Sequence, residues 1–546
     1  MSMINQAQEG SQATVEQMTI EGCEPKAAPA SPVSPEEEET KQLRKKFKET
    51  CGNTNTGLAV KAFFGMFSIV SVLAVCGIVK IHGISASQML MFLINSIFAP
   101  YSIFRMEQMH LLPDGISTSG VSRFLGNPKF NWEKLLARVG GCAAVWIASL
   151  SDSSVHKILA VDDSDYDRHC RNCNSREGMG KPNKKHKKHR KHKGSRTELV
   201  GKKYDHARKR HSWGFRKLTL VFADSMSCIP LGFTLLTNSD NSKLKGDRKT
   251  DELDHRTRAY KRRKWAQLPA IEALLMMVKR VIPFIPKVKH LCADRWFSDP
   301  ATVIRMRKGT GLHVITVLKH GQTKYLFEGK LLDIKSIFRR IKKRPGNARI
   351  LSSIIVTVPG KGEFQGQDFQ AKIVFVRNRA NRKEWIAIMS TDTTLSDEDV
   401  IQHYTLRWKI ECYFFSVKTF LGLTNECHAI SYDAIVAHTT IVALRYIMLS
   451  VEQRKAADQR TLGELVAMFT EQIRNVDIAD ALAIMADALF NAVEGVLHPT
   501  DEQMSKIIEA FYSQLPERIR KLLDLAKAKI RRLADSDAVP ELCDAS

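Results

Sequence analysis

The chain has little of what marks secreted proteins. Its 546 residues include only 11 cysteines, which give no disulfide framework in a chain this long, and no secretory signal opens the sequence. These features argue against a disulfide-stapled fold and predict a protein that works in a reducing cytoplasm.

Long hydrophobic runs are also scarce. Residues 62–79 carry no charge and are bounded by Lys61 and Lys80, which puts them at the lower limit of length for a membrane-spanning helix. The run contains Gly65 and Gly77, no second run of equal quality follows, and its flanks lack strong charge asymmetry. A buried helix or helix pair is therefore favoured over a membrane anchor, which stays as the alternative.

Acidic residues are in short supply as well. The chain has 58 Asp and Glu against 83 Lys and Arg, so its formal net charge is +25. An excess of this size suits a polyanionic partner, with nucleic acid first and an anionic membrane surface second. The length is enough for about two to four domains and a large core.

Composition and periodicity divide the chain into four predicted regions. Residues 1–50 are rich in Gln, Glu, Ser, Ala and Pro, which predicts a disordered tail. Residues 51–145 predict a helical, DNA-binding domain, residues 146–430 an α/β domain, and residues 431–546 a helical C-terminal region.

Shorter patterns lie inside the two helical regions. Residues 113–126 predict a turn followed by a short helix, compatible with a helix-turn-helix DNA reader and equally with a helix that touches no bases. Residues 434–450 are strongly apolar and predict a buried helix. Residues 516–533 predict an amphipathic, basic helix that Pro516 opens.

From about residue 155 the sequence changes to short apolar runs that are typical of strands. Strands and helices are predicted in the following order: strands 157–163, 215–222 and 229–236, helix 266–281, strand 288–294, helix 300–308 and strand 312–318. This order, followed by a long helix, matches a ribonuclease-H-like mixed sheet of the α/β class. The first strand ends in Asp162 and Asp163, and the fourth ends in Asp294.

The long helix, predicted from Ser396 to Gly422, carries an unusual polar face. Separations of three, four and seven residues place four side chains within an arc of about 60° on one helix. These side chains are Tyr404, Arg407, Glu411 and Lys418. A carboxylate flanked by cations on a rigid helix suits a metal ion and a phosphodiester, and apolar residues flank this arc on both sides.

The same spacing is that of a known motif. Tyr-x2-Arg-x3-Glu-x6-Lys, from Tyr404 to Lys418, resembles the YREK motif of DDE transposases of the insertion sequence 4 family. The segment Cys-Ala-Asp-Arg-Trp-Phe-Ser at 292–298 is similar to the second-aspartate motif of that family. The resemblance covers roughly residues 55–490 and implies a ribonuclease-H-like fold with a β-rich insertion, residues 320–396, before the Glu-bearing helix.

The chemistry of such a site follows from its ligands. Two divalent cations held by carboxylates supply a nucleophile and neutralise charge during phosphodiester cleavage, and Mg²⁺ prefers oxygen ligands. The resemblance implies that Asp163, Asp294 and Glu411 are the catalytic residues and bind two Mg²⁺ ions, for which Mn²⁺ can substitute. It also implies DNA-binding roles for the remaining residues of the motif: Tyr404, Arg407 and Lys418.

Two adjacent residues, Asp162 and Asp163, are candidates for the first catalytic acid. Side chains alternate along a strand, so only one of Asp162 and Asp163 can face the site. In the family the first aspartate is commonly followed by a small hydroxyl residue, and Asp163 precedes Ser164. Asp163 is therefore preferred, with Asp162 as the open alternative, while Asp165 and Asp167 are expected to be surface acids.

The resemblance implies a transposase that cleaves the terminal inverted repeats of its own element and joins them to target DNA. Its partners would be double-stranded DNA and a second copy in a dimeric synaptic complex, with no membrane, in the nucleoid-associated cytoplasm of a bacterium. The alternatives are a nuclease of the same fold without strand transfer, a catalytically dead DNA-binding protein, and a membrane protein anchored through residues 62–79.

One segment departs from the family pattern. Residues 169–193 contain Cys170-x-x-Cys173 and a tract of Lys, His and Arg from 184 to 193. A zinc site would need a matched second pair of ligands. A phosphate-binding loop is favoured over zinc, and a plain solvated loop is an equal alternative.

Overall fold

A computed structural model describes the chain from residue 55 to residue 520, with gaps. The described residues are 55–152, 154–168, 197–205, 209–240, 244–245, 253–346, 348–378, 384–455, 462–470 and parts of 489–520. The predicted tail at 1–50, the Lys- and His-rich segment at 169–193 and most of the predicted helix at 516–533 lie outside them.

The N-terminal described region is helical, as predicted. Its helices are α2 (Asn55–Met66), α3 (Ile69–Val75), α4 (Ala86–Asn95), α5 (Ile103–Gln108), α6 (Thr118–Leu125) and α7 (Trp132–Ser149). The uncharged run 62–79 is a helix pair, because Ser68 adopts a left-handed φ of 47° between α2 and α3. Residues 113–126 form a turn and the short helix α6, which Ser117 caps.

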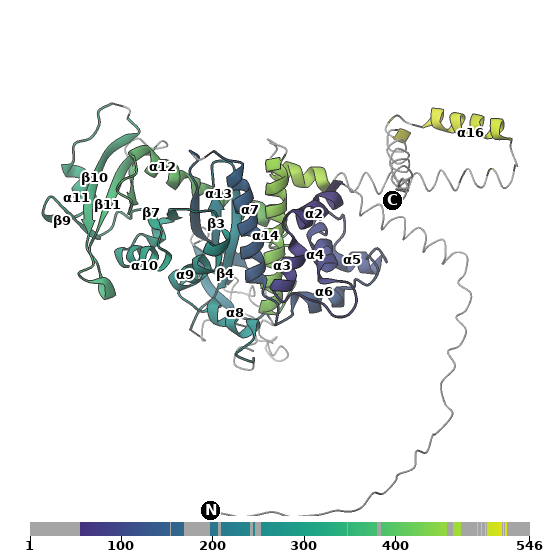
Figure 1. The fold of residues 1–546 in the computed structure, drawn as a ribbon, viewed down its shortest axis with the longest axis horizontal. Helices are drawn as coiled ribbons and strands as arrows, with labels where there is room; N and C mark the ends of the chain where they lie inside the picture. The colour runs from purple at the N-terminus through teal and green to yellow at the C-terminus, as the bar shows by residue number, and fades with distance from the viewer. Residues whose placement is uncertain are drawn as a thin grey trace, which may run out of the picture. The chain divides into compact units, whose positions relative to one another are not determined.

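Only one described helix is long and apolar enough to cross a membrane. It is α14 (Tyr432–Lys455), and its apolar part is entirely buried by protein. The buried helix predicted at 434–450 is therefore confirmed. It packs beside α7, and both helices cover β4 (Cys228–Leu236) (Figure 1).

Twelve strands of the described chain form one mixed sheet. The strand order is β5-β2-β3-β1-β6-β7-β12-β11-β10-β8-β9, with β4 also paired to β3. The first strands along the chain are β1 (Ile158–Asp167), β2 (Val200–Asp205), β3 (Arg210–Ala223), β4 and β5 (Leu244–Lys245). They are followed by β6 (His290–Ala293) and β7 (His313–Val317).

The centre of the sheet combines both strand directions. Strands β4, β3 and β1 are antiparallel neighbours, whereas β1, β6 and β7 run parallel. This arrangement is consistent with the ribonuclease-H-like fold of DDE enzymes. Val161 is in register with Ala293, so Asp162 of β1 lies beside Asp294, which directly follows β6. The strand predicted to end at Asp163 instead continues to Asp167, because β1 stays paired with β3 beyond the end of β6.

Helices connect these strands. They are α8 (Arg258–Ala266), α9 (Ala270–Val281), η3 (Ile282–Phe284), η4 (Arg295–Phe297) and α10 (Pro300–Thr310). The helix predicted at 266–281 begins only at Ala270, because Pro269 occupies its N-cap position and α8 ends at Ala266. The predicted helix at 300–308 matches α10, whose N-cap is Asp299.

A β-rich segment lies between β7 and the helices that follow. It contains β8 (Lys324–Phe327), β9 (Lys330–Asp333), α11 (Ile334–Arg340), β10 (Ile350–Val358), η5 (Gly362–Phe364), β11 (Phe369–Arg377) and β12 (Trp385–Ser390). Strand β12 pairs with both β7 and β11. The segment therefore continues the central sheet (Figure 1).

The chain then enters α12 (Asp397–Leu406), α13 (Trp408–Thr419) and α14, and α16 (Asp501–Gln514) follows near the C-terminal end of the described residues. Ser396 caps α12 through the Asp399 amide, as predicted. Gly422 lies three residues after α13 with a φ of 76°, a conformation that suits glycine.

Candidate active site

The two faces of β1 bring its side chains to different neighbours. On one face Asp162 accepts from Arg407, Ser164 accepts from Lys418 at 2.6 Å, and the Tyr166 hydroxyl donates to the Leu423 carbonyl at 3.0 Å. Because side chains alternate along a strand, this set faces α12, α13 and the turn after them. The face thus joins β1 to the helices that carry the predicted motif.

The opposite face of β1 points to cations of β2 and β3. Asp163 accepts from Arg216 Nε at 2.7 Å, and Lys203 Nζ lies 2.6 Å from Asp165 and 2.8 Å from Asp167. The convergence expected of Asp163 with Asp294 and Glu411 is therefore not what the structure has. Asp165 and Asp167 are also not free surface acids, since both pair with one buried lysine.

Three acids surround the guanidinium of Arg407. Arg407 Nη1 lies 2.6 Å from Asp162 Oδ2 and 3.3 Å from Glu411 Oε1, and Nη2 lies 4.0 Å from Asp294 Oδ1. The Asp162 side chain is 13% exposed, whereas those of Asp294 and Glu411 are each 40% exposed. The cluster is thus closed on the side of β1 and open to solvent on the other.

Secondary structure fixes Asp294 from both sides. It directly follows β6, and its carbonyl accepts from the Phe297 amide of η4 at 2.9 Å. The Thr316 hydroxyl of β7 donates to the same carbonyl at 3.1 Å. Two backbone anchors on a rigid sheet hold a ligand residue more firmly than a loop can.

The helix predicted from Ser396 to Gly422 is not continuous. It is divided into α12 and α13 at Arg407, where the Arg407 amide bonds to the Tyr404 carbonyl at 3.1 Å and the Ile410 amide to the Arg407 carbonyl at 3.0 Å. Both are three-residue steps that tighten the backbone locally. Tyr404 thus belongs to α12, Arg407 to the junction, and Glu411 to α13.

The motif side chains still lie near one another. The Arg407 guanidinium carbon lies 5.5 Å from the centre of the Tyr404 ring. On α13 the buried side of the polar strip is Ile410, Phe414 and Val417, as expected. The other side of the strip is open to solvent, because Trp408 and Phe415 are 62% and 61% exposed.

Burial and crowding set the electrostatics of the cluster. Burial raises the pKa of Asp162 to about 7, and the negative charges of Asp294 and Asp163 act in the same direction while Arg407 opposes them. Burial alone would lower the pKa of Arg407, but Tyr404 and the three acids raise it. The guanidinium is thus held in its charged form at the centre of the acids.

A second buried cation lies beneath the same face. Lys217 of β3 is fully enclosed and donates to the Tyr413 hydroxyl at 2.9 Å. Burial, together with the positive charge of the nearby Lys418, lowers its pKa to about 7. The sequence analysis did not single out Lys217, because nothing in a strand pattern distinguishes a buried lysine from a solvated one.

The donor chemistry of the three acids fits a magnesium ion, which prefers carboxylate oxygens. Their spacing is wider than a shared ion requires: no group of three acidic, histidine or cysteine side chains in the described ranges is close enough to hold one. The Arg407 guanidinium lies between them instead. The residues therefore suit the ion in kind, provided that Arg407 leaves the space between them.

Sequence comparison identifies the family of the chain. The family described as Transposase DDE domain matches residues 154–448, more than half of the 546 residues. The chain belongs to this family. The protein is therefore a DDE transposase, and the match contains all three acids together with Tyr404, Arg407 and Lys418. No curated protein sequence matches the chain.

To choose between Asp162 and Asp163, the sequence analysis of this transposase would have needed the register of β1. The choice of Asp163 rested on the hydroxyl residue that follows it. In the structure that hydroxyl, Ser164, lies on the same face as Asp162 and binds Lys418. A register that pairs Val161 with Ala293 would have favoured Asp162, but register is not visible in one sequence.

Proposed function

We propose that this transposase is of the insertion sequence 4 type, cleaves the ends of its own element and transfers them to target DNA. Asp162, Asp294 and Glu411 are its catalytic and metal-binding residues, with Asp162 in place of Asp163. The observation that carries this proposal is the convergence of these three acids on one guanidinium, within 4.0 Å, from the middle of β1, the end of β6 and the helix α13.

The reaction sets a clear task for each residue. Two Mg²⁺ or Mn²⁺ ions, when bound, supply an activated water and neutralise charge at the leaving oxygen. Asp162 of β1 and Asp294 at the end of β6 would provide oxygen ligands from a rigid sheet, and Glu411 would provide a third from α13. Precise placement of the scissile phosphate by rigid elements accounts for much of such a rate enhancement.

The remaining motif residues receive the DNA. Arg407, once released from the acids, offers a planar fork suited to bidentate contact with a phosphate. Lys418 provides a point charge that Ser164 holds at 2.6 Å, and Tyr404 a hydroxyl. The helical region before β1 would recognise the element ends, and a dimer would bring two ends together in the nucleoid-associated cytoplasm.

The test is cleavage of a labelled element end in Mg²⁺ by the variants Asp294→Asn and Glu411→Gln. We expect each to lower the cleavage rate at least about 10³-fold, while end binding measured by gel shift stays within about threefold. Glu398→Gln is the matched control, because Glu398 is an exposed acid of α12 away from the cluster. Cleavage by either variant at the control's rate would refute the assignment.

An assay for products in which the element end is joined to target DNA distinguishes a transposase from a nuclease. With a pre-cut, labelled end and a target plasmid, a transposase yields products in which the label migrates with the plasmid. Cleavage without such products would leave a DDE nuclease on the same fold.

A further inference from the structure

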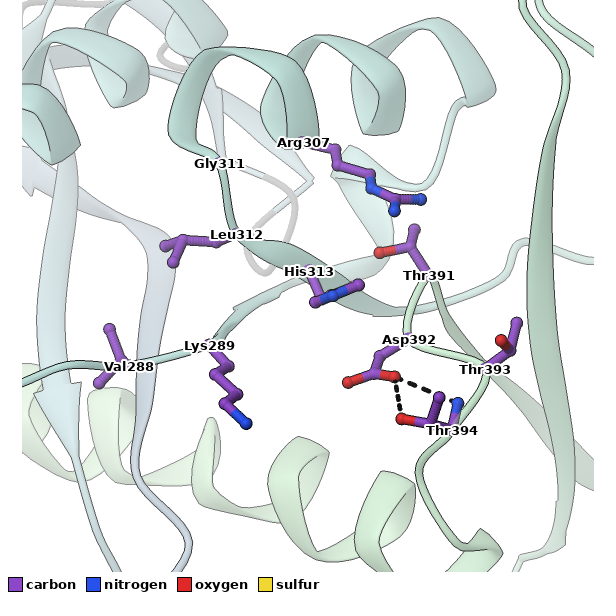
Figure 2. Close-up of a pocket in the computed structure, with 10 residues that line it drawn as sticks. All are labelled: Val288, Lys289, Arg307, Gly311, Leu312, His313, Thr391, Asp392, Thr393 and Thr394. Carbon is purple, nitrogen blue, oxygen red and sulfur yellow. Dashed lines mark hydrogen bonds between the residues drawn. The ribbon is translucent and has the colours of Figure 1, made fainter.

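A polar cavity lies at the amino edge of the parallel strands, away from the three acids. It has a volume of about 540 Å³, and its lining comes from the starts of β6 and β7, the end of α10 and the segment after β12 (Figure 2). Asp294 follows the last residue of β6, whereas Lys289 precedes its first. With about 3.3 Å per strand residue, the two sites lie roughly 17 Å apart along β6.

Two cations at this cavity have no carboxylate partner. Lys289 and Arg307 line it from different elements, and in the view of Figure 2 His313 lies between them. Neither forms an ion pair within the part of the chain that the structure describes. By contrast Arg305, two residues before Arg307, pairs with Glu272 and Glu363. Two cations without a carboxylate partner that line the same cavity attract anions to it.

The single acid of the cavity is already committed to the protein. Asp392 accepts from the Thr394 amide at 3.1 Å and the Thr394 hydroxyl at 2.6 Å, and it lies 3.0 Å from His290 Nε2. Burial would raise its pKa, but these hydrogen bonds outweigh burial and lower the pKa to about 2. Asp392 therefore orders the cavity wall, and it does not neutralise both cations.

Further polar groups of the cavity also remain available. Within the described ranges, His313 Nδ1 is buried without a hydrogen-bond partner. Thr391 and Thr393 add hydroxyl groups, and only Val288 and Leu312 are apolar among the lining side chains. Sites for small organic ligands are lined mostly by apolar groups. This lining suits a hydrated anion better, and a phosphate above all, because it accepts hydrogen bonds from several donors at once.

We propose that this cavity binds a backbone phosphate of duplex DNA at a site separate from the catalytic acids. Lys289 and Arg307 would contact the phosphate oxygens, and His313 and Thr393 would contribute hydrogen bonds. A transposase handles more than one DNA segment, and a phosphate contact at the far edge of the sheet positions DNA without reading its sequence. The inference rests on the family, not on the proposed cleavage chemistry.

The test uses the full chain carrying Glu411→Gln, so that binding is measured in the absence of cleavage. Fluorescence anisotropy with a labelled duplex, at several salt concentrations, compares Lys289→Gln/Arg307→Gln with the control Lys287→Gln/Lys308→Gln. Both pairs remove two positive charges from the same two segments, but Lys287 and Lys308 do not line the cavity. We expect the cavity pair to weaken binding about tenfold and to reduce the salt slope by about one, and the control pair to change binding less than about threefold.

Equal losses for the two pairs would overturn the proposal, since only net charge would then matter. Thr393→Asp is the second variant; it places a carboxylate in the cavity and should weaken DNA binding at least as much as the cavity pair. A free phosphate is tested by the melting temperature of the chain with added inorganic phosphate. If phosphate stabilises the parent and not the cavity pair, while both bind DNA equally, the cavity takes a free anion and the DNA proposal fails.

Discussion

The two faces of β1 carry neighbouring acids in contrasting settings. On the face of Asp163, Asp165 and Asp167, every carboxylate lies within 2.8 Å of a nitrogen of Arg216 or Lys203. On the other face, Asp162 shares a single guanidinium with two acids of other elements, one of them 4.0 Å away. On the first face each carboxylate has a cation in direct contact, whereas on the second face three acids share one guanidinium.

That difference separates structural acids from acids suited to a divalent cation. Local pairs stabilise the sheet and leave little charge for a ligand. Three carboxylates around one cation leave a net negative charge, which one or two divalent ions can neutralise more completely than Arg407 does. To recognise a candidate metal site, it is therefore more useful to ask how many different strands and helices contribute the acids than to count the acids.

The largest expected effect comes from removing the shared cation. Arg407→Gln should tighten Mn²⁺ binding to the DNA-free protein at least about tenfold, because a unit charge about 4 Å from a cation is worth roughly 4 kcal/mol near a protein surface. Electron paramagnetic resonance of free Mn²⁺ measures this directly. Arg216→Gln on the opposite face is the matched control and should leave Mn²⁺ binding unchanged. Equal Mn²⁺ affinity in the two variants would abolish the contrast between the faces.

The next effect concerns the locally paired face. Lys203→Met should lower the free energy of unfolding by about 3 kcal/mol, because Asp165 and Asp167 lose the lysine that both of them contact. Urea denaturation measures the change, with Lys202→Met as the neighbouring control. Cleavage per folded molecule should not change. A loss of cleavage without a loss of stability would instead give this face a role in catalysis.

A smaller effect is expected from the pH dependence of stability. His438 lies 3.2 Å from the carbonyl of Gly422, next to the Leu423 carbonyl that Tyr166 binds. Burial, with help from Arg445, lowers the pKa of His438 to about 3. Between that value and the unfolded value of about 6.5, the unfolded chain binds the extra proton, so stability falls as pH falls.

The size of this effect follows from the linkage. From about pH 7 to about pH 5 the wild type should lose roughly 2 kcal/mol more than His438→Gln, which cannot titrate. Urea denaturation of both proteins at the two pH values measures the difference. Identical pH dependence of the two proteins would mean that folding does not lower the pKa of His438.

Local sequence patterns predicted much of the fold. The strands predicted at 229–236 and 312–318 and the starts of α10 and α12 agree with the structure, because apolar runs and capping residues act over a few positions. The break of the long helix at Arg407 was missed. At the break the Arg407 guanidinium contacts Asp162 of a distant strand, and no capping residue or proline marks the junction in the sequence.

The sequence predicted most of the individual residues of the candidate site, but it did not predict which of them lie together. The spacing of Tyr404, Arg407, Glu411 and Lys418 identified the helical segment, and the strand-end position identified Asp294. Which of Asp162 and Asp163 points towards Asp294 and Glu411 depends on how β1 pairs with β6. The sequence does not show this pairing. The amino-edge cavity had no sequence signal, since its lining comes from four separated segments.

The most direct test of the account is the cleavage rate of Asp162→Asn beside that of Asp163→Asn, with circular dichroism confirming that both fold. The two variants make the same chemical change one residue apart on opposite faces of β1. We expect Asp162→Asn to lose cleavage at least about 10³-fold and Asp163→Asn to lose less than about tenfold. The reverse order would contradict the assignment of the catalytic face.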